Sequence, residues 1–106
     1  RWQKKIEKQL CGKKIVAVRY MTPQEAESSG WYYQPILLIL DDGTALCPMD
    51  SDEGNEAGSI ACMGDGTALC PMSDCEGNEA GALSVFQGTS KTEPVMDTIP
   101  VMRERL

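Results

Sequence analysis

The chain contains one segment twice. Residues 42–58 and 65–81 match at 14 of 17 positions, at an offset of 23 residues, and the three differences lie together in the middle. Two copies are too few for a stacked repeat fold, which needs about three. We therefore interpret the repeat, residues 42–64 and 65–87, as a local duplication inside one small domain of residues 1–106. An intact-mass measurement on the purified protein checks the duplication, because a protein with a single copy would be lighter by the mass of 23 residues.

Each copy begins with Asp-Gly between apolar runs, a strong hairpin signal that predicts a type I′ turn at Asp42-Gly43. The preceding run Ile36–Leu40 is apolar throughout, so we expect both of its faces to be covered. Thr44–Met49 should return antiparallel, and Pro48, which has no N–H, predicts that this strand lies at a sheet edge or ends early. The weaker run Ser59–Met63 precedes the second turn. The second hairpin should therefore extend the sheet, loop out or pair with another subunit.

Two short helices are predicted near the start of the chain. Trp2, Ile6 and Leu10 recur every four residues between lysines, which indicates an amphipathic helix that ends at Gly12 and packs on a sheet. The segment 22–25, Thr-Pro-Gln-Glu, matches a capping box and starts a helix that ends by residue 30. Further strands are expected over 15–21, 82–86, 94–96 and 100–102. The fold class is α+β, a mainly antiparallel sheet of β-hairpins with one or two short helices.

Charge is distributed unevenly along the 106 residues. Six of the ten basic residues fall in the first 14 positions, whereas residues 41–79 hold ten acidic residues and no basic one. This pattern is typical of a solvated face at each end, or of charge pairing between subunits. The net charge of −6 argues against nucleic-acid binding, and no apolar run approaches the length of a membrane span. We expect no nucleic-acid or membrane partner and a cytoplasmic location.

Five cysteines and no histidine limit the possible chemistry. Without histidine there is no Ser-His-Asp or Cys-His arrangement. The sequence also lacks the Cys-x-x-Cys pair that would indicate a zinc site. We expect reduced, mostly buried thiols, with Cys47 and Cys70 packed at the same repeat position. A carboxylate pair remains possible for acid–base work, either Asp41 with Asp42 or Glu53 with Glu56. No cofactor is expected, and no catalytic residue is assigned.

The acidic loop and an aromatic cluster are the candidate binding elements. Asp50 and Asp52 resemble the first ligands of a calcium loop, but Gly54, Asn55 and Ala61 stand where a ligand, the turn glycine and the bidentate Glu belong. The loop is thus expected to be a turn, with no metal. The three consecutive aromatic residues after the second helix either stack on a ligand or cover the edge of a core. The candidate ligand-binding residues are Trp31, Tyr32, Tyr33, Asp50, Asp52, Glu53 and Asn55.

Several segments resemble a group of small bacterial proteins without known activity, including proteins from integron mobile gene cassettes. The matching segments are Ile15–Thr22, Gln24–Glu27, Gly30-Trp31, Leu38–Thr44 and Glu76–Leu83. The resemblance covers roughly residues 12–86 without one repeat copy, and the duplication departs from the group. It implies a small cytoplasmic α+β protein, often oligomeric.

The function favoured by these observations is a homo-oligomeric binding or interaction module without catalytic activity, with a small molecule as a possible ligand. Two alternatives remain. One is a small-molecule enzyme that uses carboxylates in a cleft between subunits, and the other is a divalent-cation site in the acidic loop.

Overall fold

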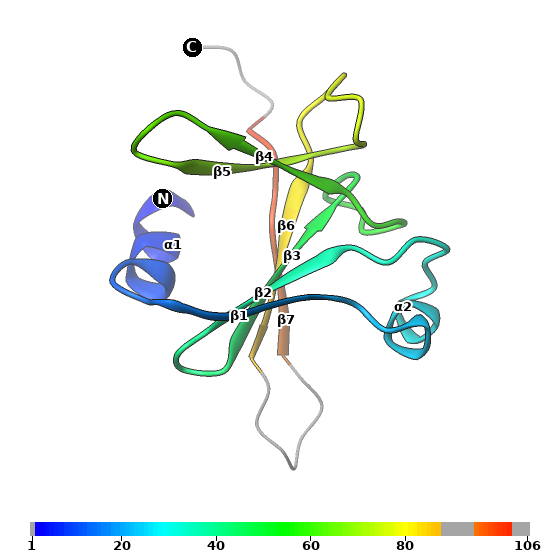
Figure 1. Cartoon of the computed structure of the whole chain (residues 1–106), viewed down its shortest axis with the longest axis horizontal. Coiled ribbons are helices and arrows are strands. Elements are labelled where there is room, and N and C mark those ends of the chain that lie inside the picture. The colour runs from blue at the N-terminus through cyan, green and yellow to red at the C-terminus, as the bar shows by residue number, and fades with distance from the viewer. Residues whose placement is uncertain (1, 88–94, 103–106) are drawn as a thin grey trace.

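The computed structural model describes residues 2–87 and 95–102 (Figure 1). In these residues two helices and seven strands follow one another: α1 Trp2–Leu10, β1 Ile15–Tyr20, α2 Pro23–Ser29, β2 Ile36–Leu40, β3 Thr44–Met49, β4 Ser59–Met63, β5 Ala68–Met72, β6 Ala82–Gln87 and β7 Val95–Ile99. All strand pairs are antiparallel. The predicted α+β class with a hairpin-rich antiparallel sheet is confirmed.

The strands form a five-stranded sheet and a separate two-stranded ribbon. The sheet has the order β1-β2-β3-β6-β7, and the ribbon consists of β4 and β5. Figure 1 shows the ribbon crossing the sheet at the end opposite the β2–β3 turn. The second hairpin therefore does not extend the main sheet, and its two strands pair with each other.

The two repeat copies exchange strands. Each copy supplies a first strand, a polar loop and a second strand. The first strand of copy one, β3, pairs with β6, which is the second strand of copy two, from Thr44 opposite Gln87 to Met49 opposite Ala82. The remaining two strands, β4 and β5, pair with each other, and Ser59 lies opposite Met72. Because Ser59 and Ala82 hold the same repeat position, the two ladders have equivalent registers.

The helix signals near residue 22 are confirmed in detail. The Thr22 hydroxyl accepts a hydrogen bond from the Glu25 backbone N–H (3.2 Å), and the Glu25 carboxylate accepts one from the Thr22 N–H (2.9 Å). Gly30 ends α2 in the left-handed region with φ 78°. The first helix ends at Leu10, just before the predicted stop at Gly12. It lies beside the end of β7 and the residues that follow, where Ile6 and Leu10 line a cavity of about 460 Å³ together with 99–102.

The β2–β3 turn forms at the predicted place with a different geometry. The Gly43 N–H donates to the Leu40 carbonyl (3.0 Å), and Gly43 has φ 86°, whereas Asp42 has a negative φ. The turn is therefore type I followed by a left-handed glycine, and the predicted type I′ turn is wrong. The Asp42 carboxylate favours this form because it accepts from the Thr44 N–H (3.0 Å) and binds Lys13 Nζ (2.9 Å).

The prediction that Pro48 marks an edge or early end of its strand is also wrong. β3 lies between β2 and β6 and continues through Pro48 to Met49. The Pro48 carbonyl accepts from the Gly58 N–H (3.0 Å), and within a strand the N and C=O of one residue point to the same side. The missing N–H therefore faces Gly58, on the side away from β6, and no bond of the β3–β6 ladder is lost.

The core lies between the sheet and α2. Its buried members are Met21, Ala26, Trp31, Leu37, Cys47, Met49 and Ala82. Cys47 is fully buried, but Cys11, Cys62, Cys70 and Cys75 are exposed, so the expectation of mostly buried thiols is wrong. Copy two has no helix comparable to α2 over its strands among the described residues, which explains why Cys70 is exposed although Cys47 is not.

The end of the chain gives one strand where two extended segments were expected. Residues 95–99 form β7, and Pro94 lies outside the described residues. Residues 100–102 belong to no strand, consistent with Pro100 ending the ladder because it has no N–H to donate.

Candidate functional site

The loops that follow β3 and β5 have the same backbone geometry. In copy one, Asp50 N–H donates to the Glu56 carbonyl, and in copy two Ser73 N–H donates to the Glu79 carbonyl, both at 3.0 Å. The left-handed glycines Gly54 (φ 71°) and Gly77 (φ 74°) occupy equivalent positions. The three sequence differences between the copies thus leave the loop conformation unchanged.

Among the described residues, the loop of copy one is hydrogen-bonded to the aromatic segment and the loop of copy two is not. The indole Nε1–H of Trp31 donates to the Gly54 carbonyl (2.8 Å). The backbone N–H groups of Tyr32 and Tyr33 donate to the two carboxylate oxygens of Glu56, at 3.0 and 2.9 Å. This loop therefore binds residues 31–33 within the chain and fixes the connection between α2 and β2.

The Glu56 carboxylate is adapted to this task. Burial acts to raise its pKa, but the backbone N–H groups of Tyr32, Tyr33 and Ala57 outweigh it, and the pKa is lowered from 4.5. Hydrogen bonds that donate to a carboxylate favour its charged form. Glu56 is therefore an ionised anchor at neutral pH. It was proposed from sequence only as half of a carboxylate pair with Glu53, and the donors around it were not apparent in the sequence.

The structure separates the three aromatic candidates. Trp31 is buried in the core, whereas Tyr32 is 93% exposed and Tyr33 is 70% exposed. Of the three aromatic residues, only Trp31 therefore packs against the core, as the core-edge interpretation of the cluster predicted. Tyr33 lies at the rim of the cleft described below, and Tyr32 does not.

The acidic candidates lie together in the loop of copy one. A carboxylate oxygen of Glu53 accepts from the Asn55 side-chain amide (3.1 Å), and Asp50 Oδ1 is buried with no hydrogen-bond partner in the described part of the chain. Across residues 2–87 and 95–102, no three Cys, Asp or Glu side chains are grouped so that they could hold a metal ion. The loop thus brings these residues near one another without forming a cation cage.

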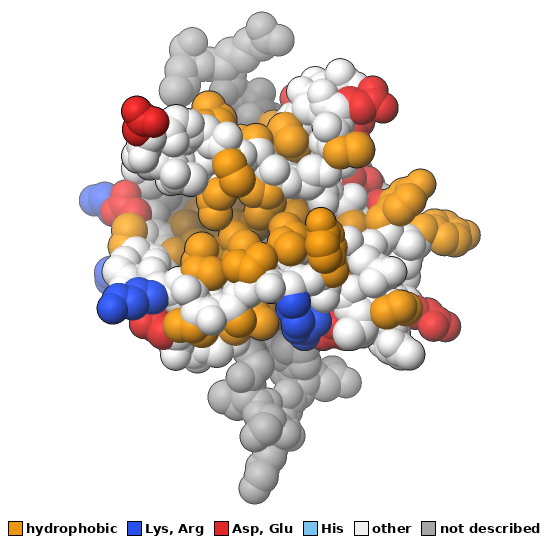
Figure 2. Space-filling view, viewed as in Figure 1, with side chains coloured by type: hydrophobic (Ala, Val, Ile, Leu, Met, Phe, Trp, Pro, Cys, Tyr) orange, Lys and Arg blue, Asp and Glu red, His pale blue; other side chains and the backbone are white. Residues whose placement is uncertain are grey.

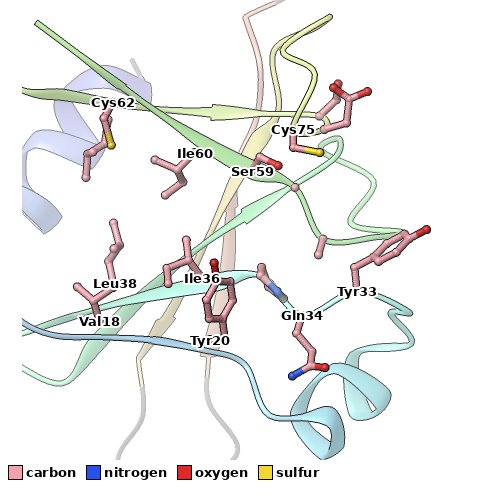
Figure 3. A pocket seen from close by; sticks show the side chains of 16 residues that line it. Val18, Tyr20, Tyr33, Gln34, Ile36, Leu38, Ser59, Ile60, Cys62 and Cys75 are labelled. Atoms are coloured by element: carbon pink, nitrogen blue, oxygen red, sulfur yellow. The ribbon is translucent and has the colours of Figure 1, made fainter.

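An apolar cleft of about 780 Å³ opens between the ribbon and the sheet (Figures 2 and 3). Its apolar wall residues are Val18, Tyr20, Ile36 and Leu38 from the sheet and Ile60, Cys62 and Leu69 from the ribbon. Figure 2 shows hydrophobic side chains gathered in a hollow across this face, and in Figure 3 Ile60 and Cys62 point from β4 toward the sheet. The sequence did not predict this cleft, because the cleft exists only when β4 and β5 pair as a ribbon apart from the main sheet.

The lower wall of the cleft is an edge strand with exposed apolar side chains. Among the described strands β1 pairs with β2 alone, and all six of its residues are exposed. Val18 is 57% exposed and Tyr20 is 67% exposed. Edge strands with exposed apolar side chains are prone to pairing or packing with a further chain. The β-branched residues Ile15, Val16 and Val18 were the signal in the sequence that predicted this strand.

Two carboxylates outside the cleft are held in ion pairs. Arg19 Nη1 lies 2.7 Å from Glu25 Oε1, and hydrogen bonding from Arg19 and Thr22 lowers the Glu25 pKa from 4.5 to about 2. Hydrogen bonding from Lys13 and Thr44 lowers the pKa of Asp42 below its usual range. A carboxyl group that acts as a general acid at neutral pH needs a raised pKa, whereas the pKa values of Glu25 and Asp42 are lowered.

Comparison with protein-family models, with curated proteins and with solved structures found no match to this chain. None of the helices in the described residues is long and apolar enough to cross a membrane. The chemistry of the molecule is therefore argued from its own residues, and its most prominent surface features are the apolar cleft and the two equivalent loops.

Proposed function

We propose that this protein is a non-catalytic interaction module whose copies meet at the apolar cleft between β1 and the ribbon. The observation that carries the proposal is the row of exposed apolar side chains on the edge strand β1, directly below the apolar face of β4. Val18 and Tyr20 leave most of their surface in water in the isolated chain. Covering such side chains contributes about 25 cal/mol for each Å² removed from water.

A second copy of the chain is the occupant that the charges favour. Lys4 and Lys8 of α1 are exposed, and so are Glu76 and Glu79 in the loop of copy two. Opposite charges at different places on one molecule steer two identical molecules toward contact, with an effect that weakens as salt rises. Apolar burial then holds the contact that the charges orient.

Light scattering after size-exclusion chromatography tests this proposal. The parent chain is expected to elute as a dimer or larger particle at high micromolar concentration. Tyr20→Lys, which puts a charge on the cleft wall, is expected to reduce the particle to one chain. Tyr32→Lys is the matched control, because Tyr32 is exposed but lies outside the cleft. A monomeric parent chain at high concentration would overturn the proposal.

A small apolar ligand is a second candidate occupant of the cleft. The volume of about 780 Å³ lies within the range of ligand pockets, roughly 300–1,000 Å³. A hydrophobic fluorescent dye that binds the parent chain, and binds Tyr20→Lys at least tenfold more weakly, would support a ligand site. If light scattering then shows a monomer, the cleft serves a ligand and not a second chain.

A further inference from the structure

The loop of copy two repeats every group with which copy one holds residues 31–33, yet none of the described residues occupies it. The Gly77 carbonyl corresponds to that of Gly54, and the Glu79 carboxylate corresponds to that of Glu56. Ala80 N–H donates to Glu79 Oε1 (3.1 Å) as Ala57 N–H donates to Glu56 Oε1 (3.0 Å), so the two carboxylates have the same orientation.

The surface next to this loop also repeats. Ile60, Cys62 and Leu69 line the cleft, so alternation along the strands places Cys70 and Met72 on the opposite face of the ribbon. At the equivalent positions of copy one, Cys47 and Met49 are fully buried beneath Trp31 and α2.

That outer face is open. Cys70 is exposed and Met72 is partly exposed, and the residues of the neighbouring loop, Asp74 to Ala80, are exposed as well. The Met72 sulfur lies 3.5 Å from the place of a Cβ on Gly77, matching the 3.4 Å between Met49 and Gly54. The ribbon thus presents the floor on which an indole ring rests in copy one.

We infer that the loop of copy two, with the outer face of the ribbon, binds a Trp-containing extended segment of another polypeptide. The indole N–H would donate to the Gly77 carbonyl, the ring would cover Cys70 and Met72, and two successive backbone N–H groups would donate to Glu79. The geometry of the segment is the one that Trp31, Tyr32 and Tyr33 already have at copy one.

We assign the segment to a different protein, because the two loops of the chain outnumber its Trp-Tyr-Tyr segments. Each chain carries one Trp-Tyr-Tyr segment and two loops, and its own segment fills the first loop. Exchange of the segment between two copies of this chain would fill one loop only by vacating another. Exchange of the Trp-Tyr-Tyr segment between copies therefore cannot saturate the second loop.

Titration of the ¹⁵N-labelled full chain with a synthetic peptide of residues 29–35, Ser-Gly-Trp-Tyr-Tyr-Gln-Pro, tests the inference by NMR. The backbone amide signals of Gly77 and Ala80 are expected to shift and saturate, and replacing the peptide Trp by Ala should abolish the shifts. Glu79→Ala should weaken binding at least tenfold. Glu76→Ala, in the same loop, should change it less than twofold, because the Glu76 carboxylate accepts from the Asn78 side-chain amide and makes no bond to the peptide in the proposed complex.

The possible outcomes separate the explanations. Absence of shifts at Gly77 and Ala80 at millimolar peptide would overturn the inference, as would shifts confined to Gly54 and Ala57, since the peptide would then replace the chain's own segment. Equal weakening by Glu76→Ala and Glu79→Ala would reduce the effect to general charge and would also overturn it. Repeating the titration on Tyr20→Lys keeps this site separate from the cleft, because binding should persist there even if self-association is absent.

Discussion

Gly58 and Gly81 lie at one crossing point and contact the same two carbonyl groups. A Cβ added to Gly58 would lie 2.5 Å from the Met72 oxygen and 2.6 Å from the Met49 oxygen. A Cβ added to Gly81 would lie 2.5 Å from the Met49 oxygen and 2.6 Å from the Met72 oxygen. The two repeat copies therefore cross with approximate two-fold symmetry, and the crossing is close enough that only hydrogen fits in place of a side chain.

Substituting either crossing glycine should destabilise the protein. Gly58→Ala and Gly81→Ala each place a methyl group against backbone that cannot move away as a flexible side chain can, so we expect losses of about 1–3 kcal/mol in the free energy of unfolding. Gly66→Ala is the control, because it has open space around it and a φ outside the positive range. Urea denaturation of the three variants measures the difference, and an unchanged midpoint for both crossing variants would contradict it.

The repeat offers a matched pair for the anchoring carboxylate. Glu56→Ala removes the acceptor of the Tyr32 and Tyr33 N–H groups and should cost about 1 kcal/mol, at the low end for lost hydrogen bonds because water reaches these exposed residues. Glu79→Ala removes only the bond from its neighbour Ala80 and should change stability by less than about 0.5 kcal/mol. Thermal unfolding of both variants measures this, and equal effects would show that the aromatic segment does not depend on Glu56.

Local signals in the sequence were sufficient for most of the elements and for the two hairpins, but not for the pairing of β3 with β6. The capping box at Thr22 and Glu25 acts over three residues, so the sequence alone predicts α2 and its start. Cys47 and Cys70 have identical neighbours in sequence, yet one is buried and the other exposed. What distinguishes them is whether α2 and Trp31 lie above, and this depends on contacts between residues far apart in the chain.

The same limit applies to the candidate site. The sequence identified Trp31 and the acidic loop separately, but the bond from Trp31 to Gly54 joins residues 23 positions apart. The prediction of the turn type at Asp42 was wrong for a local reason. The Asp42 carboxylate accepts a hydrogen bond from the Thr44 N–H, which favours a type I turn, and the hairpin rule does not take this bond into account. The cleft was invisible because both of its walls belong to apolar runs that a sequence pattern would assign to a core.

Acid should weaken the link between β1 and α2. The Glu25 pKa is lowered in the folded chain from 4.5 to about 2, so the stabilisation that this carboxylate provides is present above pH 4.5 and is lost as the pH falls toward 2. The Arg19 and Glu25 side chains are 46% and 41% exposed, so solvent screening limits the contribution to about 1 kcal/mol or less.

Comparison of the parent chain with Glu25→Gln between pH 2 and pH 6 checks this prediction. Glutamine keeps an oxygen acceptor for the Thr22 N–H of the capping box but has no charge for Arg19. The stability difference between the two proteins should be largest at pH 6 and should shrink as the pH falls through 4.5 toward 2. A difference that does not depend on pH would mean that the ion pair does not contribute.

Deletion of residues 58–80 should double the number of chains in the particle. The crossing needs two first strands and two second strands, and the full chain supplies them from its two copies. The deletion joins Ala57 to Gly81 and so keeps one intact loop. Ala57 is bridged to Met49, however, and it lies with Gly58 on the side of β3 that faces away from β6. The strand that follows can then restore the Met49–Ala82 ladder only by pairing with β3 of a second chain. Light scattering of the deletion variant and the full chain, at equal concentrations, gives the ratio of chains per particle, and dilution should unfold the variant because its stability depends on concentration. A ratio of one, with unfolding independent of concentration, would show that a single copy closes its own hairpin and that the exchange of strands is not built into the loop.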